Sequence, residues 1–199
     1  MVIRMQQTEG TRVDTEETIA LPAEASAALA FWKSLRGSRA LPCRSAFRPF
    51  EWRAWMSDIS IIELHEGDNR YFVSLHGGGT QEKIGVNLHK RYMEDNLDRH
   101  ARSLALDPYR EAERTGLPTF STLTPMLYPG VFHAFPRLVL PFTDGTSSEG
   151  PQRIDRFVTW IGNAPKKRYG VEELCHAQRM DRHRATEIRE RVGLTVLPA

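Results

Sequence analysis

The chain has few cysteines and no long hydrophobic run. Its 199 residues include two cysteines, Cys43 and Cys175, which match neither a CxxC redox pair nor a metal-binding quartet, so we expect two reduced thiols. No stretch reaches the about eighteen apolar residues that a membrane-spanning helix needs. Residues 1–20 are polar and acidic where a signal peptide requires an apolar segment. We therefore expect a cytoplasmic protein without membrane contact.

Neither sign of charge dominates. Lysine and arginine number 27 and aspartate and glutamate 25, so the net charge is +2, too small by itself to indicate nucleic-acid binding. With 40% apolar and 26% charged residues, the composition is that of a globular domain. The length predicts one domain with extensions.

Catalytic and phosphate-binding motifs are also missing. The chain has no GxSxG elbow, and Cys43, next to Arg44, has no identifiable general base. The run Gly77-Gly78-Gly79 is not followed by a Lys-Ser/Thr pair, so we interpret it as a tight exit from a strand rather than a phosphate loop. The sequence thus gives no support for an enzyme.

The histidines do not form a metal-binding pattern. There are seven, and HxH, HExxH and Cys/His clusters are absent, which favours isolated surface or strand-edge residues over a metal site. Were haem bound, His89 or His100, in the central crossing, is the candidate axial ligand. The residues leave the cofactor unknown, and a protein without any cofactor is one alternative.

Three segments follow from the pattern of the chain. Residues 1–20 lack periodicity and predict a mobile arm. Residues 21–162 predict the domain, beginning with an amphipathic helix that Gly37 ends; its apolar face comprises Ala25, Ala28, Leu29, Phe31, Trp32 and Leu35. Residues 163–199, with the basic run Lys166-Lys167-Arg168 and many charges of both signs, predict a helical extension suited to a protein partner.

Five β-rich runs predict an α+β domain with a five-stranded antiparallel sheet. Residues 58–65 and 70–76 form a hairpin, a loop-rich helical crossing covers residues 80–100, and a helix from about residue 94 to 115 is interrupted near Asp107-Pro108. Strands at 118–126, 131–142 and 153–161 complete the sheet. The residues expected to face the interior or the helices are Ile59, Ile61, Phe72, Leu75, Val139 and Phe157.

Three groups of residues carry a resemblance to a known family. The first comprises Trp32, Leu35, Arg36, Gly37, Leu41, Pro42, Arg44 and Pro49, the second comprises Gly79, Thr80, Gly85 and Leu88, and the third comprises residues 138–141 and 154–157. They resemble the opening signature, the motif after the hairpin and the closing strands of a family of small PAS-domain proteins of alphaproteobacteria, and the resemblance covers roughly residues 25–162. A second glycine common soon after Leu88 is replaced by the bulkier run His89-Lys90-Arg91-Tyr92.

The resemblance implies a sensor or relay, with five strands curved around a cavity that central helices cover. A regulatory protein without an output domain of its own would act on a separate signalling protein. We expect a small ligand in the cavity, lined by Tyr71, Tyr92, Met93 and Leu97. The alternatives are an enzyme that uses the same pocket and a structural interaction domain whose core is filled by its own side chains.

The helix at residues 25–35 carries more aromatic surface than a short helix leaves in water. Two interpretations stay open: it packs on the sheet of its own domain, or it pairs with a second copy. We predict a homodimer through Leu29, Phe31 and Trp32.

Overall fold

The computed structural model describes residues 21–164, except 66, 68, 98, 124–125, 129–130, 133 and 146–152, together with residues 195–196. The predicted arm at residues 1–20 and most of the predicted helical extension at 163–199 lie outside the described residues. The described part of that extension includes a two-residue strand, β9 (Thr195–Val196), which pairs with β4.

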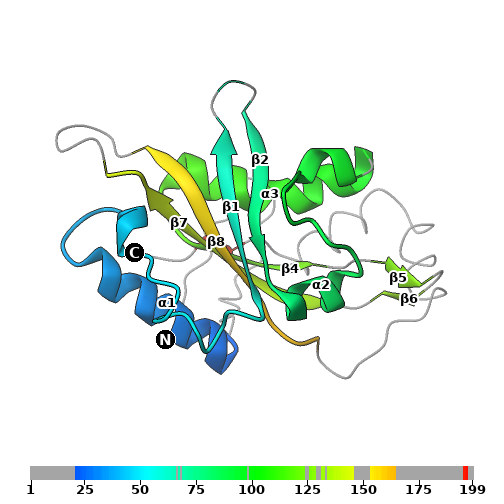
Figure 1. The fold of residues 1–199 in the computed structure, drawn as a ribbon, viewed down its shortest axis with the longest axis horizontal. Helices are drawn as coiled ribbons and strands as arrows, with labels where there is room; N and C mark the ends of the chain where they lie inside the picture. The colour runs from blue at the N-terminus through cyan, green and yellow to red at the C-terminus, as the bar shows by residue number, and fades with distance from the viewer. Residues whose placement is uncertain are drawn as a thin grey trace, which may run out of the picture.

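Five long strands form the centre of an antiparallel sheet (Figure 1). They are β1 (Ile59–His65), β2 (Arg70–His76), β4 (Thr119–Leu123), β7 (Phe135–Thr143) and β8 (Ile154–Ile161). The spatial order is β3-β2-β1-β8-β7-β4-β9, so the first and last long strands in the chain are neighbours. The domain is therefore of mixed helix and antiparallel sheet, as predicted.

The sheet has more strands than the predicted five. Two-residue strands, β3 (Arg91–Tyr92) and β9, extend its edges to seven. The run predicted as one strand at 118–126 divides between β4 and β5 (Met126–Tyr128), which pairs with β6 (Val131–Phe132) in a separate small sheet. Alternating apolar residues identify strands, but pairing at the edges depends on segments that return from elsewhere in the chain.

Three helices and two 3-10 turns complete the described fold. They are α1 (Ala23–Arg36), η1 (Arg44–Ala46), α2 (Gly78–Ile84), η2 (Met93–Asn96) and α3 (Arg99–Thr115). Gly37 ends α1 with φ of 59°, a left-handed conformation that glycine adopts without strain. The predicted end of this helix is confirmed.

The predicted interruption of the longer helix is wrong, because α3 continues through Pro108. Proline removes one backbone N–H from the helical ladder, but α3 is held against the sheet by tertiary contacts. Among them, the Thr119 hydroxyl donates to the Pro108 carbonyl at 3.0 Å. Packing on β4 and β7 thus outweighs the local preference.

The glycine run lies where β2 gives way to α2. A Cβ atom on Gly77 would collide with the carbonyl oxygen of Ser57, and one on Gly79 with the side chain of Asp58, whereas Gly78 has open space. The run lets the start of α2 approach the backbone that precedes β1. This agrees with a tight exit from the strand.

Helices cover both faces of the sheet (Figure 1). Side chains alternate along β7, so Arg137 reaches α3, where Ala105 accepts its hydrogen bond, while Phe142 on the other face contacts Trp52 in the segment that follows α1. Most residues expected inside are buried, namely Ile59, Ile61, Val139 and Phe157. Leu75 packs at the edge of the core, and Phe72 is only half-buried.

Candidate functional site

A buried polar cluster lies between the sheet and α3. Arg137, only 2% exposed, donates from Nε to the hydroxyl of Ser121 at 3.0 Å and from Nη1 to the carbonyl of Ala105 at 2.9 Å. Burial lowers the pKa of Arg137 from its usual value because desolvation disfavours the charged form. A guanidinium in such a place is costly unless polar groups surround it.

Tyr109 extends this cluster toward β8. Its hydroxyl lies 3.0 Å from the Thr159 hydroxyl, and its ring centroid is 5.4 Å from Phe157 and 5.5 Å from Tyr71. Burial raises the pKa of Tyr109. The α3 side of the sheet thus brings hydroxyls and a guanidinium together within an aromatic wall.

Three of the four predicted ligand residues belong to the hydrophobic core or pack against it. Tyr71 and Met93 are buried, and Leu97 packs against the same core. Tyr71 donates from its hydroxyl to Glu113 at 3.3 Å, and its pKa is raised, first by burial and then by the charge of Glu113.

The fourth residue, Tyr92, lies elsewhere. It is paired with Phe72 on β2, its ring packs on Phe72 and His65, its hydroxyl is 2.9 Å from His65 Nδ1, and the Arg70 guanidinium lies 4.0 Å from its ring centroid. Since Phe72 and Tyr71 are adjacent on a strand, they point to opposite faces. Tyr92 therefore lies on the face of the sheet away from Tyr71.

The signature residues fasten α1 and the segment after it to the end of β7. Trp32 donates from Nε1 to the carbonyl of Pro141 at 2.8 Å, and the carbonyl of Pro42 accepts from the amide of Thr143 at 3.0 Å. Cys43 forms a parallel β-bridge with Thr143, and its thiol lies 3.4 Å from the Asp144 carbonyl. We call these contacts, with the ion pair described next, the clamp.

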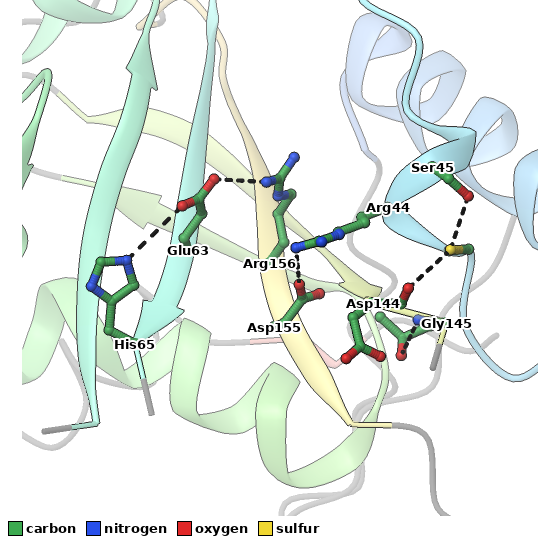
Figure 2. A network of polar contacts seen from close by, with 10 residues as sticks. Arg44, Ser45, Glu63, His65, Asp144, Gly145, Asp155 and Arg156 are labelled. Atoms are coloured by element: carbon green, nitrogen blue, oxygen red, sulfur yellow. Dashed lines mark hydrogen bonds and ion pairs between the residues drawn. The ribbon is translucent and has the colours of Figure 1, made fainter. Parts of the chain in front are cut away.

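An ion pair completes the clamp on β8. In Figure 2, Arg44 reaches from η1 to Asp155, with Nη1 3.2 Å from Oδ2. The other carboxylate oxygen of Asp155 is buried without a hydrogen bond, and burial raises the pKa of Asp155 although Arg44 lowers it. The signature Arg44 thus joins the first segment of the domain to its last strand.

A second ion pair lies beside the clamp. Arg156 and Glu63 are cross-strand partners on β8 and β1, with 2.7 Å between Nη2 and Oε1, and His65 Nε2 lies 4.0 Å from Glu63 (Figure 2). Both pairs are partly exposed, so each contributes little stability alone. Their effect is to fix the position of side chains across the strands.

The residues predicted to form a dimer interface are packed within the domain. Leu29 and Trp32 are at most 1% exposed, and Phe31 packs between Trp52 and Trp55, with ring centroids at 5.1 and 5.9 Å. The first of the two interpretations of this helix is therefore correct for its apolar face, and Leu29 and Trp32 have no free surface for a second copy. Self-association itself stays a prediction.

The haem candidates lie in different parts of the central crossing. His89 is exposed and His100 is the second residue of α3; no three potential metal ligands gather anywhere in the described residues. Within the same residues, no helix has the length and apolar character to cross a membrane.

Sequence analysis missed Arg137, Tyr109 and Thr159. Arg137 had a detectable signal, because it is the one charged residue in the otherwise apolar run from Phe135 to Phe142. A charge that interrupts a buried strand usually has polar partners. Tyr109 and Thr159 gave no such signal, since both residue types are common in helices and strands.

Comparisons with known proteins add little. No family model matches the chain, and neither does any curated protein. One similar solved structure is that of an RNA-binding light-oxygen-voltage receptor, with 12% sequence identity and a TM-score of 0.40, covering 74% of this chain. The match spans 38% of the length of that receptor.

Proposed function

We propose that the chain is a PAS-like sensory domain. A small ligand between the sheet and α3 would alter the contacts that hold α1, and a separate signalling protein would receive the change. The resemblance of the signature residues supports this class. The succession of one helix, two strands, a helical crossing and three long strands also supports it.

One observation carries the proposal: β7 serves both the buried polar cluster and the clamp. Arg137 near its start faces α3, whereas Pro141 and Thr143 at its end hold Trp32 and Pro42. Since a strand is a stiff unit within a sheet, a shift at one end is transmitted to the other. The proposed ligand lining comprises Tyr71, Met93, Leu97, Tyr109, Arg137 and Thr159.

Native mass spectrometry of the freshly purified full chain tests for the ligand. We expect a bound small molecule in the wild type. The fraction of protein that carries it should be lower in the Tyr109→Phe variant, which keeps the ring and loses the hydroxyl. Returning the molecule to stripped protein should slow hydrogen exchange in α1. The proposal fails if the folded protein carries no small molecule, or if bound molecule leaves exchange in α1 unchanged.

A structural interaction domain is the second candidate, because the polar groups of the cluster between the sheet and α3 are bonded to one another. Arg137 is bonded to Ser121 and Ala105, and Tyr109 to Thr159. A wild-type protein without ligand, but with a stable partner complex, would favour this candidate. Turnover of a bound molecule would instead favour the enzyme.

A further inference from the structure

The segment from the end of α1 to Arg53 is strongly basic. Of the seven charged residues between positions 33 and 53, six are cationic and one, Glu51, is acidic, although the whole chain carries only +2. The fold keeps this segment together: Phe31 of α1 packs on Trp52 and Trp55, so α1 and residues 47–55 lie side by side. The excess positive charge therefore lies on one continuous segment of the chain, whose two ends pack together.

Among the described residues, two of these six cations have an acidic partner. Arg44 is paired with Asp155, and Arg48 lies 4.0 Å from Glu51. In the part of the chain that the structure describes, no carboxylate lies within ion-pair distance of the other four, which are Lys33, Arg36, Arg39 and Arg53. We call these four, with Arg48 and Phe50, the basic surface.

Phe50 supplies an apolar centre to the basic surface. It is 75% exposed, whereas the neighbouring Trp52 is fully buried. The Arg53 guanidinium lies 4.5 Å from the Phe50 ring centroid and donates to the Phe50 carbonyl at 3.3 Å. This contact holds an aromatic ring in water next to cations, where burial by a partner would be favourable.

The residue types of the basic surface are those of protein interfaces. Four of its five cations are arginine, which with aromatic residues is enriched in protein interfaces, whereas lysine is depleted there. Arginine also binds carboxylates in bidentate geometry. We infer that the basic surface docks an acidic segment of a partner protein, with an apolar side chain of that segment on Phe50.

This inference rests on the proposed relay function, because it names the class of partner that receives the signal. The clamp lies in the same segment as the basic surface: Trp32 precedes Lys33, and Arg44 lies between Arg39 and Arg48. A change at β7 that moves the clamp would therefore move the docking residues. The partner would sense the position of the segment rather than the ligand itself.

Fluorescence anisotropy with two labelled peptides tests the inference on the full chain. One peptide alternates glutamate with leucine in a helical pattern, and the other has serine in place of leucine. The double variant Arg39→Glu/Arg53→Glu should weaken binding of the glutamate–leucine peptide at least about tenfold. Arg110→Glu/Arg114→Glu on α3, both exposed, changes the net charge equally and should leave the affinity within about twofold.

The Phe50→Ser variant separates the apolar contact from the charge. It should weaken binding of the glutamate–leucine peptide roughly fivefold or more and that of the glutamate–serine peptide less than about twofold. Equal effects of the two charge-reversal variants would overturn the inference. So would tighter binding of single-stranded RNA or phosphatidylserine vesicles that is lost in the Arg39/Arg53 variant.

Circular dichroism establishes that each variant is folded, and a variant that does not fold is replaced by the corresponding glutamine substitutions. Failure here is distinguishable from failure of the proposed sensory site. The peptide titration reports only on the basic surface, whereas native mass spectrometry reports on the interior. Absence of an interior ligand together with peptide binding would refute the sensor and support the docking surface.

Discussion

The hydrogen bond between Tyr109 and Thr159 allows a sharp test of the buried polar cluster. Both residues are at most 3% exposed, and their hydroxyls lie 3.0 Å apart. Tyr109→Phe leaves the Thr159 hydroxyl buried without this partner, and Thr159→Val leaves the Tyr109 hydroxyl in the same condition. The double variant removes both polar groups, so neither is left unsatisfied.

The magnitudes follow from the cost of an unsatisfied buried group. Each single substitution should lower the free energy of unfolding by about 1–3 kcal/mol. For a chain of this length that corresponds to a fall in Tm of about 2–12 °C. The double variant should be less destabilised than the sum of the two, with a coupling free energy of about 0.5–3 kcal/mol.

Urea denaturation followed by circular dichroism measures the free energy of unfolding of the wild type, the two single variants and the double variant. Tyr92→Phe is the matched control, because it removes the same atom from a half-buried tyrosine bonded to His65, where water can replace the partner. Its effect should be below about 1 kcal/mol. Additive effects of the two interior substitutions, or a control as damaging as Tyr109→Phe, would refute the assignment of this hydrogen bond to the core.

Three further predictions concern neighbouring glycines, the clamp and the core. Gly77→Ala should lower the free energy of unfolding by about 1–3 kcal/mol because its Cβ meets the Ser57 carbonyl, whereas Gly78→Ala, which has open space, should raise it by about 0.4–1 kcal/mol; urea titration that gives both the same sign contradicts this. Burial raises the pKa of Asp155 from its usual 3.8, so this group contributes stability below that pH, which is lost as the pH rises through the raised pKa. Asp155→Asn should therefore have a higher Tm than the wild type at neutral pH, with the difference shrinking in acid; a lower Tm at neutral pH would mean that the pair with Arg44 outweighs burial. Phe157→Ala should lower the free energy of unfolding by about 3–5 kcal/mol, since its side chain is fully buried, and a scanning-calorimetry Tm unchanged from the wild type would place Phe157 outside the core.

The helix, its end and the long strands could be predicted because they depend on local patterns. The spacing of Ala25, Ala28, Leu29 and Trp32 matches one helical face, and those residues are buried. Gly37 ends the helix because other residues rarely adopt its positive φ. The ends of the β-rich runs lie within four residues of the ends of the five long strands.

The direction in which side chains point required the tertiary structure. Tyr71 and Tyr92 both looked suitable for a pocket, yet Tyr92 pairs with Phe72 on the face away from Tyr71. The pairing of β3 with β2 decides this, and no local pattern in residues 89–92 specifies it. Arg137 was similarly recognisable as a charge within an apolar run, but only the packing of α3 on β7 identified Ser121 and Ala105 as its partners.

By itself, the sequence determined the order of elements, the amphipathic helix and the signature residues, because periodicity and backbone preference act over a few neighbouring positions. Only the tertiary structure decided what the signature residues do. Trp32 and Arg44 lie more than one hundred residues from Pro141 and Asp155, respectively, in the chain. In the pairing of β7 with β8, Phe142 is opposite Arg156 and Thr143 is opposite Ile154, so the register skips Asp155. Such contacts arise from closure of long loops and from an irregular register, which propensities at single positions do not encode.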